Sequence, residues 1–169
     1  MSTSRIELLQ RMPIFGGVRD DVLQCLLDRA QFCKIPAREF FFRQGDQALY
    51  MYVLEAGRAS VRKTWNGAEL ELGTLSQGDC FGEMALIDMT ARSASVRAET
   101  ECSAIEISSV NLHNVYEYDV EQFTIIQMNI SRELCRRLRM TDERLMRVAA
   151  VTQESSSEDE LTWPQLLPL

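Results

Sequence analysis

A succession of short β-prone stretches between Cys33 and Ile107 restricts the fold more than any other feature of the sequence. The stretches are rich in β-branched and aromatic residues: FFFRQG, YMYVLEAG, ASVRKTW, ELELGTLS, ASVRAE and CSAIEIS. Turn signals separate them, and the clearest is Asn66–Gly67, because both residues tolerate the positive φ angles of a type I′ hairpin. Closely spaced strands with such turns predict an antiparallel barrel or jelly roll.

Helical spacing flanks this region on both sides. Residues 5–33 place apolar residues three and four apart, with interruptions at Pro13 and Gly16–Gly17, which predicts two short helices. From Val120 to about Val151 the chain has neither glycine nor proline, which predicts one long helix. The expected fold is therefore α+β and mainly β: an antiparallel jelly roll with N-terminal helices, a short helix within residues 81–96 and a long C-terminal helix.

The predicted long helix carries a stripe of residues spaced alternately four and three apart: Leu134, Leu138, Thr141, Leu145 and Val148. This spacing is typical of a two-stranded coiled coil, so we expect a homodimer through this helix. Packing of the same stripe on the chain's own barrel is the alternative. Thr141 stands where an aliphatic residue would pack better, which indicates that its hydroxyl has a partner.

The helix pattern ends before an acidic segment. We expect residues 1–151 to form one domain and residues 152–169, TQESSSEDELTWPQLLPL, to form an acidic and flexible tail, because Pro164 and Pro168 prevent a long helix. The end of this tail, LTWPQLLPL, is apolar enough to dock on a surface of this chain or of a partner.

Charge and residue usage exclude several classes of function. The formal net charge of −7 argues against a nucleic-acid partner. The chain has no apolar run long enough to cross a membrane and its start lacks a signal-peptide pattern, so we expect a cytoplasmic protein that does not bind membranes. Five widely spaced cysteines form no CxxC pair and are expected to be reduced and mostly buried. The single histidine, His113, leaves little for a metal centre or a catalytic triad, so we expect no metal and no enzyme activity.

The stretch FGEMALIDMTARSASV, residues 81–96, combines groups that suit a sugar phosphate. Gly82 permits a sharp turn and a close approach to the backbone, and the apolar run after Glu83 predicts a helical turn whose N–H groups face an anion. Arg92 supplies a planar fork for two phosphate oxygens, whereas Glu83 suits a ribose hydroxyl. The simpler alternative is a surface ion pair between Glu83 and Arg92.

These residues resemble the cyclic-nucleotide-binding domain family. The family pattern of glycine and glutamate, then Ala-Leu, then arginine, a small residue and alanine is matched in order and spacing by Gly82, Glu83, Ala85, Leu86, Arg92, Ser93 and Ala94. The turn at Gly45–Asp46, the stretch YMYVLEAGRASV and the stretch QGDCFGE agree with the same family. The resemblance covers roughly residues 5–150 and implies a barrel with a phosphate cassette and a long helix over the pocket.

The resemblance also implies the roles of individual residues. Arg92 would pair with the cyclic phosphate, Glu83 and the Gly82 backbone would hold the ribose 2′-OH, and the main-chain N–H groups of Ala85 and Ser93 would bind phosphate oxygens. The remaining ligand-binding candidates are the cassette residue Met84, the barrel residues Val61 and Leu72, and the helix residues Arg137 and Thr141. Asp142 departs from the serine that the family pattern places after the threonine, which puts in doubt a second contact from a partner subunit.

The resemblance implies a free-standing cAMP receptor that changes conformation on binding and signals to a protein partner. Transcription regulators of the family carry a helix-turn-helix domain after the long helix, and residues 152–169 are too short to form one, so we expect no DNA binding. Three alternatives stay open. Ser93 could also reach a guanine, which makes cGMP a second candidate ligand, and the chain could be a ligand-free interaction module or the sensor part of a transcription regulator.

Overall fold

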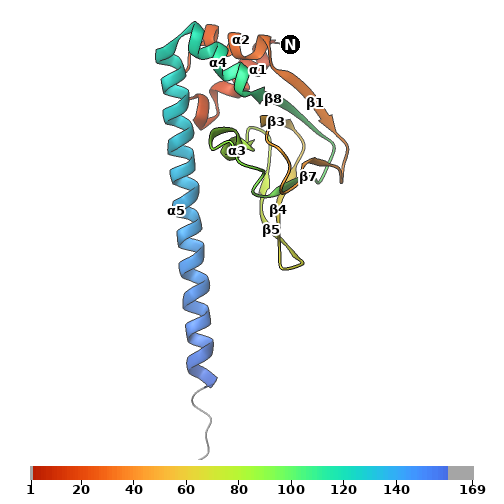
Figure 1. Cartoon of the computed structure of the whole chain (residues 1–169), viewed down its shortest axis with the longest axis vertical. Helices are drawn as coiled ribbons and strands as arrows, with labels where there is room; N and C mark the ends of the chain where they lie inside the picture. Colours follow the sequence, from red (N-terminus) through yellow and green to blue (C-terminus); the bar gives the residue numbers. More distant parts are fainter. Residues whose placement is uncertain (1, 160–169) are drawn as a thin grey trace, which may run out of the picture. The chain divides into compact units, whose positions relative to one another are not determined.

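The computed structural model describes residues 2–159, with the side chains of residues 2–4, 85–86 and 151–159 excepted (Figure 1). The chain divides into two compact units, Met1–Ile130 and Ser131–Leu169, and each unit is described by itself. The first unit contains the helices and strands that the sequence predicts for the barrel, and the second contains most of the long helix.

The first unit begins with the two predicted N-terminal helices, α1 (Ser2–Gln10) and α2 (Asp20–Asp28), with a short 3₁₀ helix, η1 (Pro13–Phe15), between them. Pro13 opens η1, where its fixed φ angle suits a helix start and its missing N–H is not needed. The α2 helix begins with two aspartates and buries four aliphatic side chains: Val22, Leu23, Leu26 and Leu27.

Eight strands within residues 2–159 form two four-stranded antiparallel sheets. The first sheet has the order β1-β8-β3-β6 and the second has the order β2-β7-β4-β5. Their bounds are β1 (Gln31–Ile35), β2 (Phe40–Phe42), β3 (Tyr50–Ala56), β4 (Ala59–Trp65), β5 (Ala68–Leu75), β6 (Cys80–Phe81), β7 (Ser95–Ala98) and β8 (Cys102–Ser108). This architecture confirms the predicted fold class.

The β4–β5 hairpin forms where the sequence predicts it. Asn66 and Gly67 have φ angles of 50° and 81°, as a type I′ turn requires. The strands pair from Trp65 opposite Ala68 to Ala59 opposite Leu75, and a bulge after Val61 leaves one extra residue on β5. On the side of the bulge away from the turn, the pairing of β4 with β5 is therefore offset by one residue.

Aromatic rings fill part of the core in the first unit. Tyr52 on β3 and Phe81 on β6 stack with ring centroids 5.2 Å apart. Phe41 on β2 meets both rings edge-on, with centroid distances of 5.5 Å and 5.0 Å. Burial raises the pKa of Tyr52 to about 12. These contacts join residues of the two sheets.

One helix of the first unit, α4 (Ser109–Tyr118), is missing from the sequence-based expectations. Its start is marked by a capping box, in which Ser108 Oγ accepts a hydrogen bond from the Asn111 N–H and the Asn111 side chain accepts one from the Ser108 N–H. The serine–x–x–asparagine spacing is a weak signal, because asparagine is a less common partner in this motif than glutamate.

The long helix α5 (Val120–Asp159) starts in the first unit, where Ile126 and Ile130 are buried. Asn129 Nδ2 donates to the carbonyl oxygens of Ile14 at 3.3 Å and Gly16 at 2.9 Å. Gln122 Oε1 accepts a 2.8 Å hydrogen bond from a backbone N–H of the N-terminal segment. These polar contacts fix the first turns of α5 against the N-terminal helices.

The second unit is helical from Ser131 to Asp159. The helix extends beyond its expected end near Val151 and continues to Asp159, through a serine- and glutamate-containing stretch without proline. The domain at residues 1–151 and the flexible tail at residues 152–169 stay predictions. The stripe residues Leu138, Leu145 and Val148 are exposed within this unit. The LTWPQLLPL segment lies outside the described residues.

All five cysteines are thiols, but only Cys80 and Cys102 are fully buried, fewer than expected, and Cys135 is exposed. In the part of the chain that the structure describes, no helix has the length and hydropathy to span a membrane. No cluster of three or more potential metal ligands occurs among the same residues.

Candidate functional site

The candidate site starts at Gly82, where the chain leaves β6 and enters the short helix α3 (Glu83–Ile87). Gly82 has φ 78° and ψ 7°, a left-handed conformation that L side chains rarely adopt. A Cβ atom at this position would lie 2.7 Å from Arg92 Nη1 and 3.3 Å from Phe42 Cε1. Gly82 is therefore required both by its backbone conformation and by the close approach of the arginine.

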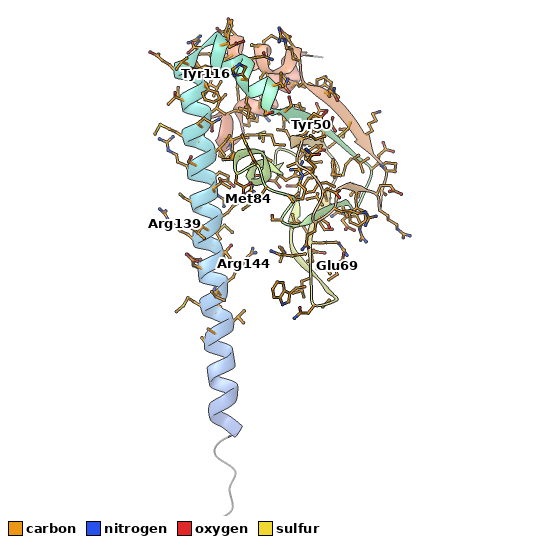
Figure 2. The ribbon with its side chains drawn as sticks, in the orientation of Figure 1. Tyr50, Glu69, Met84, Tyr116, Arg139 and Arg144 are labelled. Atoms are coloured by element: carbon orange, nitrogen blue, oxygen red, sulfur yellow. The ribbon has the colours of Figure 1, made fainter. Side chains whose placement is uncertain are left out.

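Helix α3 presents its N-terminal N–H groups without a side-chain cap, because Gly82 occupies the capping position. Its other end is closed by the Asp88 N–H, which donates to the Met84 carbonyl oxygen at 2.9 Å. Met84, which is labelled in Figure 2, lies on α3. Its side chain is about half exposed. The uncapped first turn, next to a buried cation, suits a bound anion.

The backbone of Arg92 is fixed by the turn at Gly45–Asp46. The Arg92 N–H donates to the Asp46 carbonyl oxygen and the Arg92 carbonyl oxygen accepts from the Gly45 N–H, both at 2.9 Å. Asp46 Oδ2 in turn accepts a 2.7 Å hydrogen bond from the Arg43 N–H, which closes the turn. The Gly45–Asp46 signal in the sequence thus positions the arginine of the cassette.

The Arg92 side chain lies in a cage of backbone carbonyls and an aromatic ring. Nη1 donates to the Gly82 carbonyl oxygen at 2.7 Å and Nη2 donates to the Tyr50 carbonyl oxygen at 2.5 Å. The guanidinium carbon lies 4.0 Å from the centroid of the Phe42 ring. The labelled Tyr50 marks β3, the strand that supplies the second carbonyl (Figure 2).

Burial makes this cation unusual. Arg92 is 4% exposed, and the loss of solvent lowers its pKa, although a guanidinium stays charged in proteins. Its Nε has no hydrogen-bond partner among the described residues, and two of its five N–H groups are used by the carbonyls. The side chain therefore keeps donors for a ligand. Glu83 is 2% exposed, so the alternative of a surface Glu83–Arg92 ion pair is wrong.

The other predicted barrel residues lie on neighbouring segments. Ser93 follows Arg92 directly and is exposed. Val61 on β4 is half-buried and pairs with Val96 of β7, the strand that follows Ser93. Leu72 is the extra residue of the β5 bulge and is 45% exposed. The roles of these residues, and of the α3 residue Ala85, stay predictions.

The two predicted helix residues lie in the second unit. Arg137 Nε donates to Glu133 Oε1 at 3.0 Å, four residues earlier on α5. Thr141 Oγ1 donates to the Arg137 carbonyl oxygen at 3.0 Å, so its hydroxyl finds its partner within its own helix. Their contact with a ligand is a prediction that rests on the family pattern.

Sequence reasoning missed two parts of the site. The Tyr50 carbonyl oxygen and the Phe42 ring both contact the Arg92 guanidinium, yet neither was proposed as a site feature. Every residue has a backbone carbonyl oxygen, so the residue type at position 50 could not indicate that this carbonyl binds Arg92. The FFF run predicted only a strand, because the sequence does not distinguish a phenylalanine that contacts a cation from one that packs in the core.

The comparisons with known proteins agree with this geometry. The family described as "Cyclic nucleotide-binding domain" matches residues 32–119, which contain all of the cassette. The chain is 32% identical over 132 residues to the cAMP-activated global transcriptional regulator CRP of Salmonella typhimurium, an alignment that covers 77% of this chain and 61% of that protein. The chain thus spans less than two thirds of the length of this relative.

Two solved structures have the same fold. The Thermus thermophilus catabolite activator protein matches with a TM-score of 0.72 and 27% identity, over 81% of this chain and 63% of that one. A cyclic nucleotide-binding domain from Methylobacillus flagellatus matches with a TM-score of 0.77 and 19% identity, over 98% of this chain and 86% of that one. The family model is described by cyclic nucleotide binding, and the Salmonella relative is described as a transcriptional regulator. The present chain belongs to the cyclic nucleotide-binding domain family.

Proposed function

We propose that this protein is a receptor for cAMP. The observation that carries the proposal is the buried Arg92 guanidinium, which lies beside Gly82 at the uncapped start of α3. A cyclic phosphate bound there would accept charge-assisted hydrogen bonds from the arginine and further hydrogen bonds from the backbone N–H groups of the α3 turn. Neutralising a buried cation favours binding, because the charge is desolvated before the ligand arrives.

A phosphate bound at this position would also determine where the ribose and the base lie. Glu83 accepts a hydrogen bond from the ribose 2′-OH, and the main-chain N–H groups of Ala85 and Ser93 donate to phosphate oxygens. Val61 and Leu72 line the sugar or the base, and Met84 lies on the cassette helix. Arg137 and Thr141 meet the base from the long helix.

We prefer cAMP because the CRP relative is described as cAMP-activated and because Thr141 offers a hydroxyl for adenine. The competing ligand is cGMP, since the Ser93 hydroxyl could bind the amino group of a guanine. A direct comparison of the two nucleotides decides between them.

Binding would act on a protein partner, through a change in the long helix. The exposed stripe on α5 favours a homodimer, with Leu138 and Leu145 at the seam. The reduced cysteines favour a cytoplasmic location. DNA binding is not part of the proposal, because the formal net charge of −7 argues against a nucleic-acid partner.

A second candidate function is a ligand-free interaction module, and one observation favours it. The Arg92 guanidinium donates hydrogen bonds to two backbone carbonyl oxygens, so groups of the protein itself hold the side chain in place. This candidate predicts that no cyclic nucleotide raises the melting temperature.

Isothermal titration tests both candidates. The full-length chain is unfolded and refolded to remove any bound nucleotide, and is then titrated with cAMP and with cGMP. A dissociation constant in the micromolar range or below for cAMP, with weaker cGMP binding, supports the receptor. Preference for cGMP changes the ligand, and no heat from either nucleotide in a folded sample refutes the receptor.

A further inference from the structure

A groove of about 540 Å³ lies in the first unit, and Arg92 is not among the residues that line it. It is formed by residues of α3, of α4 and of the first turns of α5: Ile87, Leu112, His113, Tyr116, Phe123 and Gln127. Tyr116 is 45% exposed and Ile87 is 43% exposed, so the groove presents apolar surface to solvent. Figure 2 labels Tyr116 on α4.

Aromatic rings define the groove. The rings of His113 and Tyr116 stack with centroids 5.9 Å apart, and Tyr116 meets Phe123 edge-on at 5.5 Å. His113 Nε2 also lies 3.4 Å from Glu117 Oε1, one turn further along α4. Rows of aromatic rings of this kind recognise extended, proline-containing segments, because such segments lose little conformational entropy on binding.

The chain carries a segment with this chemistry. Residues 161–169, LTWPQLLPL, contain a tryptophan, four leucines and two prolines, and no charged residue. Each proline favours extended backbone in the residue before it. We propose that residues 161–169 of one copy of this protein dock in the Ile87–Phe123 groove of a second copy.

Chain length keeps Trp163 out of the groove of its own copy. The helix from Ser131 to Asp159 rises about 42 Å, and the extended chain from Asp159 to Trp163 spans at most about 14 Å. Trp163 therefore stays at least about 28 Å from Ser131 of its own chain, whatever the angle between the two units. Phe123 and Gln127 precede Ser131 on the same helix by only about 6–12 Å. Docking that places Trp163 in the groove is therefore intermolecular, and it does not depend on the proposed nucleotide.

Tryptophan fluorescence of the full-length chain tests this proposal. The chain has two tryptophans, so a Trp65→Phe background leaves Trp163 as the only one. Trp65 is 69% exposed at the hairpin turn, so its replacement leaves the core intact. We expect the Trp163 emission to be blue-shifted at high protein concentration, and to move to the wavelength of exposed tryptophan on dilution.

Two variants locate the contact. Tyr116→Ala removes the central ring of the groove and should move the midpoint of the dilution curve to about tenfold higher concentration. Leu166→Asp changes only the docking segment and should act in the same direction. Tyr118→Ala is the matched control, because Tyr118 is 56% exposed on the same helix and does not line the groove, and it should leave the midpoint unchanged.

Each alternative result overturns a part of the proposal. Exposed-type emission at every concentration shows that the segment does not dock. Blue-shifted emission that is independent of concentration shows docking within one chain. Blue-shifted emission that changes equally in the Tyr116 and Tyr118 variants assigns the segment to a surface other than this groove.

Discussion

Replacement of Arg92 by alanine should reduce cAMP affinity by roughly a hundredfold. In the structure the guanidinium is 4% exposed and uses two N–H groups on the carbonyl oxygens of Gly82 and Tyr50. Its remaining donors would make two charge-assisted hydrogen bonds to the phosphate. Bonds of this type contribute about 1.5–3 kcal/mol each, and water replaces part of that energy in the variant, so a net loss of about 3 kcal/mol is expected.

The effect on stability should be smaller than the effect on binding. Alanine removes two hydrogen bonds to carbonyl oxygens, which is destabilising, but it also removes a buried cation, which is stabilising. These terms oppose each other, so we expect the free energy of unfolding of the unliganded protein to change by no more than about 2 kcal/mol. Arg92→Lys keeps the charge without the planar fork and should lose about tenfold in affinity.

Isothermal titration of refolded protein gives the affinities, and thermal melting without nucleotide gives the stabilities. Arg97→Ala is the matched control, since Arg97 lies on β7 and contacts Glu99 at 3.1 Å on a solvent-accessible surface. It should change the dissociation constant by less than about twofold. A folded Arg92→Ala protein that binds cAMP with unchanged affinity would falsify the role given to the guanidinium.

Three further changes test the site and the helix. Gly82→Ala should abolish high-affinity binding and lower stability by about 1–2 kcal/mol, because its Cβ would lie 2.7 Å from Arg92 Nη1 at a φ of 78°; a melting curve and binding like those of the parent contradict this. Thr141→Ala should reduce the affinity for cAMP without changing the affinity for other cyclic nucleotides, as competition titration can measure; equal losses for all ligands implicate helix structure instead. Leu138→Asp combined with Leu145→Asp should convert a dimer to a monomer in light scattering, and an unchanged mass excludes the stripe as the seam.

Much of the barrel could be predicted because its signals are local. The Asn66–Gly67 turn and the alternating stretches around it specify a hairpin by backbone sterics alone. Helix α4 was missed because its cap uses Asn111 in place of the commoner glutamate or glutamine. The end of α5 was placed too early because serine and glutamate were interpreted as disorder, whereas a helix already formed can extend through them.

The site was predictable only in part, for a related reason. Gly82, Glu83 and Arg92 lie within one short stretch, so their spacing carried the prediction of an anion site. Their burial could not be predicted, because it depends on the Phe42 ring and on the Tyr50 carbonyl from distant strands. Residue types alone therefore favoured a surface ion pair, although the tertiary structure places both charged side chains in the interior.

The contacts of Arg92 also explain how ligand binding could reach the rest of the first unit. The Gly82 carbonyl oxygen accepts a hydrogen bond from the Arg92 guanidinium, and Gly82 also caps α3. A phosphate that moves the guanidinium would therefore weaken or displace this hydrogen bond at the start of the helix. Five residues later, Ile87 at the other end of α3 lines the groove that Phe123 of α5 also lines. Because α3 has only five residues, its backbone hydrogen bonds connect its two ends directly, and a displacement at one end is expected to move the other. We therefore expect nucleotide binding to alter the groove and the first turns of α5 together, and a chemical-shift change at Phe123 on addition of cAMP would measure that coupling.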